Sequence, residues 1–128
     1  MKVNTFVLNL TSERPEKLKS FYADIVGLPP AEGFGADALA AGGAILIFDG
    51  HSETRGRAQE PQRYLIDFYV DDLAAEQSRL EGQGVEFVRK GGKAWWGGVI
   101  STFCDPDGNY GQLIEFKEMP GPQGVNEA

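Results

Sequence analysis

Apolar and polar residues alternate over residues 4–10, the first regular pattern in the chain. A period of two predicts a β-strand, and one face of this strand carries the polar side chains of Thr5 and Asn9. A helical pattern follows, because apolar side chains recur at i, i+3, i+4 and i+7 in Leu18, Phe21, Tyr22 and Ile25. The chain therefore begins with a strand followed by an amphipathic helix.

The predicted helix has recognisable ends. Thr11 or Ser12 can cap its start, and Gly27 is expected to end it in a left-handed conformation. Residues 28–48 are rich in glycine and contain short apolar pieces, which predict two short strands and then a buried one. Residues 49–63 contain almost no large apolar side chain and predict an exposed connection.

The same order of patterns returns after the connection. Residues 64–70 alternate as a strand, Asp71 or Asp72 can cap the next helix, and Gly82 and Gly84 mark its end. Further strands are predicted at residues 85–88, 99–104 and 110–117. The order of strand, helix and three strands thus occurs twice, at an interval of about 60 residues.

Two such units predict an α+β fold, because a single helix covers only one face of each sheet. We expect two βαβββ modules that pair into an incomplete β-barrel, with the helices outside and a cleft inside. The expected boundaries are module one at 3–48, the connection at 49–63, module two at 64–118 and a flexible tail at 119–128. The cleft would be lined by the polar inner faces of the first strands, which carry Thr5, Asn9, Asp67 and Tyr69.

Composition narrows the class of protein. The 128 residues suffice for one domain, and 41% hydrophobic with 24% charged residues is typical of a globular chain. The formal net charge of −7 disfavours nucleic acid and anionic membrane surfaces as partners. The chain has neither a signal-peptide pattern nor a membrane-spanning apolar run, and its one cysteine, Cys104, excludes an internal disulfide. We therefore expect a cytoplasmic protein.

The segment Asp105–Asn109 reads Asp-Pro-Asp-Gly-Asn and predicts a tight turn between the last two strands. Asp105 can accept hydrogen bonds from the turn, Pro106 presets its backbone, and Gly108 relieves its exit. With the flanking Phe103-Cys104, this segment resembles the final hairpin of the glyoxalase family.

Two more segments resemble that family. Phe21-Tyr22 followed by Gly27-Leu28 is similar to the helix end of its first module, and residues 68–73, Phe-Tyr-Val-Asp-Asp-Leu, are similar to the start of its second. These matches span nearly the whole chain in the expected order. They identify the chain as resembling the vicinal oxygen chelate superfamily of glyoxalases, bleomycin resistance proteins and extradiol dioxygenases.

In metal-dependent relatives, the resemblance implies a divalent metal held by His, Gln or Glu on the first and last strands of each module. The matching positions here are Thr5, Leu46 or a neighbour, Leu65 and Gln112. Leucine cannot coordinate, and Gln112 alone is a plausible donor. A register shift by one residue does not repair the set, since it brings in Asn4, Ile66 or Gly111. We therefore predict neither a metal nor another cofactor.

The remaining chemically interesting residues have ordinary interpretations. His51 is the one histidine and falls in the polar connection, where a solvated side chain is expected unless the loop folds back over the cleft. Cys104 has no neighbouring base and is interpreted as a small structural thiol. Arg89, Lys90 and Lys93 lack the glycine spacing of a phosphate loop, so we interpret them as a solvated turn.

Asp67 and Gln112 are the weak catalytic candidates. Asp67 could be a buried carboxylate that acts as a base with a raised pKa, or an aspartate hydrogen-bonded to the next strand. Glu115 is out of phase with Gln112 and is not included.

Aromatic side chains predict a binding pocket. Trp95 and Trp96 are adjacent, so they cannot both enter one core, and such rings bind flat and cationic ligands. Ordinary core and interface filling is the equally weighted alternative. The expected ligand-binding set is Thr5, Asn9, Phe48, Leu65, Asp67, Tyr69, Trp95, Trp96, Phe103 and Gln112.

Three functions remain open. The first is a metal-free protein, resembling the bleomycin-resistance branch, that binds a small aromatic or cationic organic molecule. The second is a glyoxalase-type lyase, isomerase or dioxygenase with a non-standard site, and the third is an interaction module without catalytic function. By resemblance, we expect a homodimer.

Overall fold

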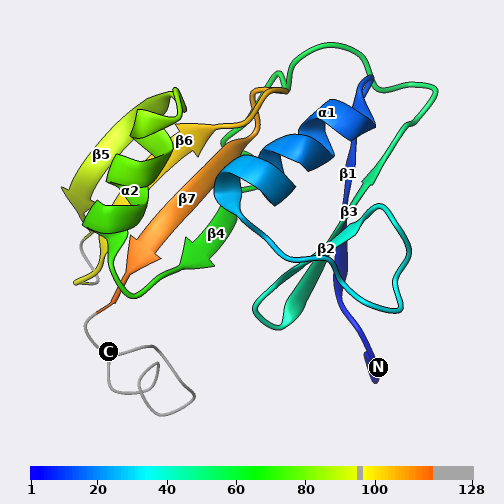
Figure 1. The fold of residues 1–128 in the computed structure, drawn as a ribbon, viewed down its shortest axis with the longest axis horizontal. Coiled ribbons are helices and arrows are strands. Elements are labelled where there is room, and N and C mark those ends of the chain that lie inside the picture. Colours follow the sequence, from blue (N-terminus) through cyan, green and yellow to red (C-terminus); the bar gives the residue numbers. More distant parts are fainter. Residues whose placement is uncertain (95–96, 117–128) are drawn as a thin grey trace. The chain divides into compact units, whose positions relative to one another are not determined.

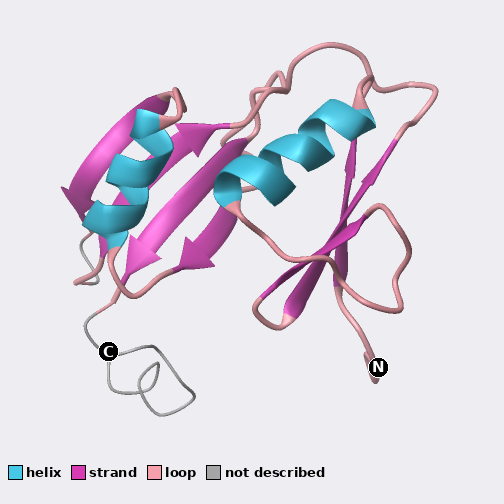
Figure 2. Cartoon of the chain, in the orientation of Figure 1, coloured by secondary structure: helices cyan, strands magenta, loops and turns pink. Residues whose placement is uncertain are grey.

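The computed structural model describes residues 1–94 and 97–116 (Figure 1). The chain divides into two compact units, of which the first comprises Met1–Gln59 with Pro106–Gly108 and the second comprises the remainder. Each unit has its own mixed sheet and helix (Figure 2), so the predicted α+β class is confirmed. Neither sheet closes into a barrel within the described ranges. The pairing of two modules around a cleft stays a prediction, and the predicted tail lies outside the described residues.

The first unit is a three-stranded sheet with a helix against β3. Its elements are β1 (Val7–Thr11), α1 (Pro15–Ser20), the π-helix η1 (Phe21–Val26), β2 (Ala38–Ala41) and β3 (Ala44–Asp49). The strand order is β1-β3-β2, with β1 parallel and β2 antiparallel to β3. The strand predicted at residues 4–10 and the helix after it are therefore present, although β1 begins later than expected.

The sequence predicted the end of the first helix correctly but not its start. The Ser12 hydroxyl accepts a hydrogen bond from the Arg14 amide at 2.9 Å, and α1 begins only at Pro15, so the predicted side-chain cap was wrong. Gly27 ends the helix with φ of 94°, as predicted. Its amide donates to the carbonyl of Tyr22 at 3.1 Å, which closes a π-helical turn.

One of the strands predicted within residues 28–48 is reduced to a single bridge. Pro30 pairs with Leu39 as an isolated antiparallel bridge, and the Pro29 carbonyl accepts a hydrogen bond from Ala40 at 2.7 Å. The Ala31 amide donates to the Ala38 carbonyl at 3.0 Å on the other side of this bridge, but neither proline has an amide hydrogen with which to extend the ladder. The first sheet therefore stops at three strands.

The second unit is a four-stranded sheet with one helix. Its elements are β4 (Ile66–Tyr69), α2 (Leu73–Gly82), β5 (Phe87–Lys93), β6 (Val99–Cys104) and β7 (Tyr110–Glu115). The strand order is β4-β7-β6-β5, in which β4 and β7 are parallel and the other pairs are antiparallel. All the strands predicted for this half of the chain are present.

β5 is longer than the sequence predicted. The strand expected at residues 85–88 continues through Arg89, Lys90 and Lys93, so these residues are solvated as predicted but lie in a strand and not in a turn. Two register shifts against β6 explain the difference, because bulges let a strand continue through glycines without a regular apolar pattern. Gly91 takes a φ of 55° within this segment.

α2 begins and ends as the sequence predicted. The Asp72 carboxylate accepts a hydrogen bond from the Ala75 amide at 3.0 Å, which satisfies a free donor of the first turn. Leu73 and Leu80 are buried beneath the helix. No helix in the described part of the chain is long and apolar enough to cross a bilayer.

Aromatic rings fill the core between each helix and its sheet. In the first unit, Tyr22 stacks on Phe48 with ring centroids 5.4 Å apart. In the second unit, Phe103 is fully buried and its ring lies across Gly111 of the neighbouring strand. A Cβ atom at Gly111 would come within 2.3 Å of the Phe103 ring, so only glycine fits there.

Candidate functional site

The second sheet has one face covered by α2 and one face that α2 does not cover. On the covered side, Glu115 accepts a hydrogen bond from the Leu73 amide at 2.9 Å, and the Ser101 hydroxyl donates to Gln77. Side chains alternate between faces along a strand, so the residues next to Glu115 and Ser101 in sequence point to the other side. This opposite face is where the sequence places its candidate site.

Asp67 and Gln112 lie side by side on the uncovered face. They are direct partners in the parallel pairing of β4 with β7. Gln112 also pairs with Thr102 of β6, and its amide nitrogen donates to the Thr102 hydroxyl at 2.9 Å. The hydrogen bond fixes the orientation of the Gln112 side chain, which is buried at 9% exposure. A carboxylate, an amide and a hydroxyl are thus grouped on adjacent strands.

Asp67 differs from its neighbours in having no side-chain hydrogen bond to any described residue. Partial burial by the surrounding strands raises the pKa of its carboxyl above 3.8, because desolvation disfavours the charged form. Neither interpretation of Asp67 from the sequence is found in full, because the residue is exposed on β4 and has no side-chain hydrogen bond to a described residue.

Exposed apolar side chains flank this polar group. Tyr69 and Leu65 alternate onto the same side as Asp67 and are each 45% exposed. Tyrosine combines a flat apolar ring with a polar hydroxyl, which suits contact with an aromatic or cationic molecule. We call the set of Leu65, Asp67, Tyr69, Thr102 and Gln112 the Asp67 face.

Two aromatic residues of the predicted binding set lie elsewhere. Phe48 is 2% exposed and stacks on Tyr22 of the first helix, and Phe103 is fully buried beneath α2. Phe103 also packs against Phe87 and Phe68, at centroid distances of 5.9 and 6.3 Å. Both phenylalanines belong to the cores on the helix-covered faces, so we leave them out of the candidate site.

The candidate residues that the sequence predicted in the first unit are exposed or hydrogen-bonded within that unit. Asn9 lies on β1 and donates a hydrogen bond to the Asp49 carboxylate at 3.1 Å, whereas Thr5 is exposed and precedes the strand. His51 is exposed in the connection, and its Nδ1 accepts a hydrogen bond from the Glu53 amide at 3.0 Å. This contact engages one of the two ring nitrogens within the loop.

The other predicted residues give less information. Trp95 and Trp96 lie outside the described residues. Cys104 is partly buried at the end of β6, which matches its interpretation as a structural thiol.

The donor set does not fit a metal of the kind that relatives bind. Leu46 is buried in the first core, Leu65 is apolar, and Gln112 uses its amide to hold Thr102. Asp67 and Gln112 could supply two oxygens, yet no group of three His, Cys, Asp or Glu side chains is gathered among the described residues. Divalent metals in such sites need three or more protein ligands.

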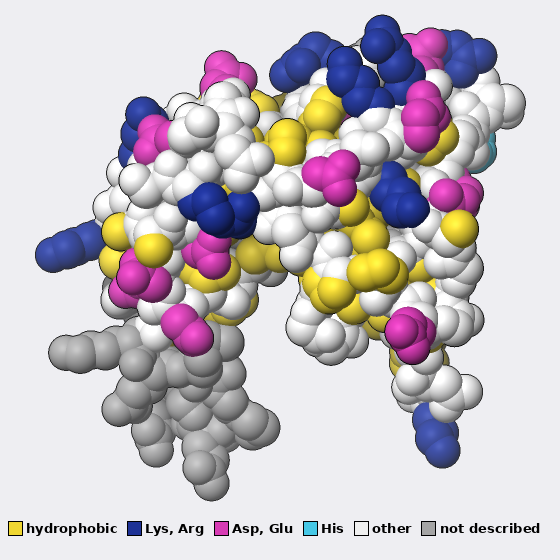
Figure 3. All heavy atoms as spheres, in the orientation of Figure 1, with side chains coloured by type: hydrophobic (Ala, Val, Ile, Leu, Met, Phe, Trp, Pro, Cys, Tyr) yellow, Lys and Arg dark blue, Asp and Glu magenta, His cyan; other side chains and the backbone are white. Residues whose placement is uncertain are grey.

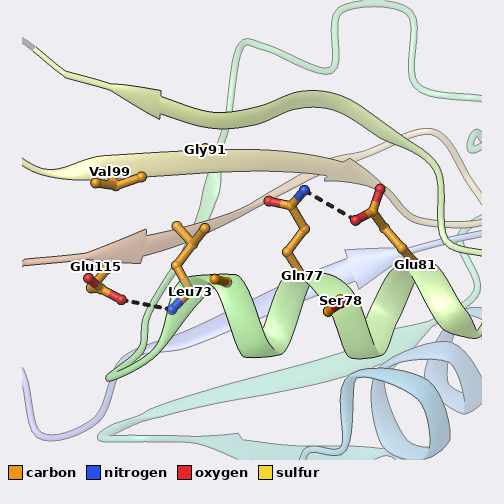
Figure 4. Close-up of a pocket in the computed structure, with 8 residues that line it drawn as sticks. Leu73, Gln77, Ser78, Glu81, Gly91, Val99 and Glu115 are labelled. Atoms are coloured by element: carbon orange, nitrogen blue, oxygen red, sulfur yellow. Dashed lines mark hydrogen bonds between the residues drawn. The ribbon is translucent and has the colours of Figure 1, made fainter.

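A groove of about 320 Å³ runs between α2 and the covered face of the sheet (Figure 4). Its polar side chains are engaged with one another. Glu115 binds the Leu73 amide, and the Gln77 amide donates to Glu81 at 3.2 Å. Glu81 also pairs with Lys90 at 2.8 Å, and the Lys90 and Gln77 hydrogen bonds lower the pKa of Glu81. These contacts join the helix to the sheet, so we do not place a ligand in the groove.

Thr102 is the residue of the Asp67 face that the sequence interpretation missed. The pair nearest the turn is Cys104 with Tyr110. Two residues further from the turn on each strand, Thr102 pairs with Gln112. The turn therefore contained a signal for this contact, because it fixes the register of both strands.

Comparisons with known proteins place this geometry in a family. The family model for the Glyoxalase/Bleomycin resistance protein/Dioxygenase superfamily matches residues 3–113. No curated protein matches the chain by sequence.

Solved structures with the same fold include a member of this superfamily from Sphaerobacter thermophilus DSM 20745. It has a TM-score of 0.70 and 19% identity, over 91% of this chain and 99% of that chain. TnmS3, an antibiotic binding protein from Streptomyces sp. CB03234, has a TM-score of 0.66 and 24% identity, over 89% and 96% of the two chains. A family enzyme from Burkholderia phytofirmans PsJN has a TM-score of 0.68 and 17% identity, over 85% and 95%. The fold and the match over residues 3–113 show that this chain belongs to the Glyoxalase/Bleomycin resistance protein/Dioxygenase superfamily.

Proposed function

We propose that this protein binds a small aromatic or cationic organic molecule against the Asp67 face without a metal. The observation that carries the proposal is the pairing of Asp67 with Gln112 on adjacent strands, with Thr102 holding the amide in place. A carboxylate without a side-chain partner among the described residues can receive a cation, and a fixed amide can receive a polar group of the same ligand.

The charge and shape of the face support this ligand class. A bound cation would lower the raised pKa of Asp67 again, because an opposite charge favours the ionised carboxylate. Tyr69 is 45% exposed beside it and offers a ring for stacking or a cation–π contact. The net charge of −7 also favours the approach of a cation over that of an anion.

Family membership is consistent with a binding protein as well as with an enzyme. One structural relative, TnmS3, is an antibiotic binding protein, and another is described as an enzyme. The choice therefore depends on the residues of this chain, in which Leu46 and Leu65 replace expected metal ligands. We infer the metal-free binding function from this donor chemistry.

One observation favours the alternative of a glyoxalase-type lyase, isomerase or dioxygenase with a non-standard site. A carboxylate with a raised pKa is suited to accept a proton, so Asp67 could act as a base beside Gln112. Turnover of hemithioacetals or catechols by the purified protein, lost in Asp67→Asn, would support this alternative over simple binding.

Calorimetric titration with planar organic cations and their uncharged analogues tests the proposed binding function. We expect saturable binding of a cation in the presence of a chelator, and a loss of about tenfold in affinity for Asp67→Asn. Asp71→Asn is the matched control, because it removes the same charge from an exposed residue outside the Asp67 face. Equal losses in both variants, or no saturable binding across the panel, would contradict the proposal.

The metal-free part of the proposal has its own measurement. Elemental analysis of protein purified without a metal-affinity step, followed by titration with divalent ions, should find no stoichiometric tight site. Tight metal that is lost in Gln112→Ala would overturn this part and would favour the enzyme.

We also propose that the protein forms a homodimer, as its family resemblance implies. Exposed apolar side chains outside the Asp67 face support this proposal, and they include Phe6, Val7 and Tyr64 on or near the first strand of each sheet. Light scattering combined with size-exclusion chromatography measures the mass directly.

A further inference from the structure

A second cavity, of about 170 Å³, lies within the first unit and is lined by basic side chains. Arg14 and Lys17 come from the start of the first helix, and Arg57 comes from the connection that follows β3. The rest of the lining is Glu13, Gly56, Pro106 and Asp107. We call this cavity the basic pocket. Figure 3 shows Lys and Arg side chains gathered along the upper edge of the view, over the start of α1 and the adjoining connection.

Arg57 is exposed and lies against the turn at Pro106 and Gly108. Its Nη1 donates to the carbonyl of Pro106 at 3.5 Å, and its guanidinium lies against Gly108, where a Cβ atom would come 2.9 Å from Nη2. The connection is tied to the same turn by the Ala58 amide, which donates to the Asp107 carbonyl at 2.8 Å. The Gly108 of the family-like turn thus leaves space for the Arg57 side chain as well as adopting a φ of 79°. These contacts place the guanidinium beside the pocket.

The positive charges of the pocket are poorly compensated. Glu13 also lines it, but its Oε1 accepts a hydrogen bond from the Gly56 amide at 2.6 Å and so holds the loop. Arg14, Lys17 and Arg57 form no ion pair with any carboxylate in the described part of the chain. Asp107 is the one other acid in the lining. Three cationic and two anionic side chains thus line the pocket, which leaves an excess of one positive charge on a chain whose net charge is −7.

We propose that the basic pocket binds a small oxyanion of the phosphate class, either free or as the phosphoryl end of a small molecule. Its volume of about 170 Å³ is below the range of about 300–1,000 Å³ usual for drug-sized ligands and suits a single anionic group. Arginine binds the oxygens of phosphate through two parallel N–H donors, and lysine adds a point charge. None of the residues of the Asp67 face lines this pocket, so the two sites are independent proposals.

Calorimetric titration of the full chain with sodium phosphate at low ionic strength tests this site. We expect saturable binding that weakens by about tenfold or more in Arg57→Gln and in Arg14→Gln. Arg63→Gln is the matched control, since Arg63 is paired with Glu60 at 2.7 Å and lies outside the pocket. Affinity within about twofold of the unaltered protein is expected for this control.

Two further measurements make the result decisive. Thermal melting without phosphate identifies a variant that fails to fold, and in that case Lys17→Gln, which alters a side chain without an ion pair among the described residues, replaces Arg57→Gln. Glycerol 3-phosphate distinguishes the two ligand sources, because tighter binding than phosphate assigns the phosphoryl end of a molecule and weaker binding assigns the free ion. The proposal is overturned if phosphate gives no saturable heat, or if Arg63→Gln weakens binding as much as Arg57→Gln.

Discussion

Each sheet begins with a strand that leads into a helix, but the two sheets expose different chemistry on the faces that their helices leave uncovered. In the first sheet, the polar residue at the middle of the leading strand, Asn9, is paired with Asp49 at 3.1 Å. In the second sheet, Asp67 lies at the middle of the leading strand beside Gln112 and has no side-chain hydrogen bond to a described residue. The polar side chains of the first sheet bond each other, whereas the carboxylate of the second has no such partner among the described residues.

The contrast between Asn9 and Asp67 indicates which polar residues on an open sheet face are evidence of a binding site. A polar residue on an open sheet face is weak evidence of a site when its partner is another side chain of the same sheet. It is stronger evidence when the side chain is partly desolvated and its neighbours are fixed, as Thr102 fixes Gln112.

The largest effect is expected from removing the core rings. Phe48→Ala and Phe103→Ala should each lower the free energy of unfolding by about 3–5 kcal/mol, because each deletes a buried ring and leaves a cavity. Tyr69→Ala, on the uncovered face of the second sheet, should cost less than about 1 kcal/mol. Urea denaturation of the three variants measures these differences. A small loss for either phenylalanine would return that residue to the predicted binding set.

A smaller loss is expected from adding one methyl group at Gly111. Its Cβ atom would come within 2.3 Å of the Phe103 ring, so Gly111→Ala should destabilise the second unit by about 1–3 kcal/mol through overpacking. Gly43→Ala is the control in the first unit, because no atom lies within 4 Å of its Cβ position and its φ is not positive. Thermal melting of both variants checks the contrast, which disappears if the two substitutions cost the same.

The two helices differ at their starts, because α2 has a side-chain cap and α1 has none. Asp72→Ala removes the acceptor of the Ala75 amide and should cost about 0.5–2 kcal/mol. Arg14 occupies the corresponding position of α1 without a side-chain cap, so Arg14→Ala should change stability by less than about 0.5 kcal/mol. Chemical denaturation gives both values, and a larger loss for Arg14→Ala would show that its side chain stabilises the helix by another contact.

The sequence predicted most of the fold because its strongest signals are local. Alternation and helical spacing predicted the leading strand and helix of each unit, and the segment Asp105–Asn109 predicted the final hairpin. There the Asp105 carboxylate accepts hydrogen bonds from the Asn109 amide and side chain, each at 2.9 Å. The errors occurred where local pattern and backbone chemistry disagree, as at Pro30, which allows only an isolated bridge.

The candidate site was less predictable because it depends on register between strands far apart in sequence. Alternation placed Asp67 and Gln112 on an inner face, but the parallel pairing that makes them neighbours cannot be read from either strand alone. The same limit explains Phe48 and Phe103, whose aromatic character is equally compatible with a cleft and with a core. Arg57 was not singled out, since its importance comes from its contact with the distant Gly108.

The smallest effect, a dependence of stability on pH, tests the feature that separates the two sheets most directly. The pKa of Asp67 is raised above 3.8 in the folded protein, so folding favours its protonated form. Its contribution to stability is complete at pH values below 3.8 and is lost as the pH rises through the raised pKa. Asp67→Asn carries a permanently neutral side chain and should therefore melt at a higher temperature than the unaltered protein at pH 7, with the difference vanishing at about pH 3.

Asp71→Asn corrects this comparison for the general effect of removing one negative charge from a chain of net charge −7. Melting curves of both variants and the unaltered protein at the two pH values provide the measurement. If Asp67→Asn gives no gain at pH 7 beyond that of Asp71→Asn, Asp67 is as well solvated as an ordinary surface carboxylate. The uncovered faces of the two sheets would then be equivalent, and the assignment of ligand binding to the second sheet would lose its electrostatic basis.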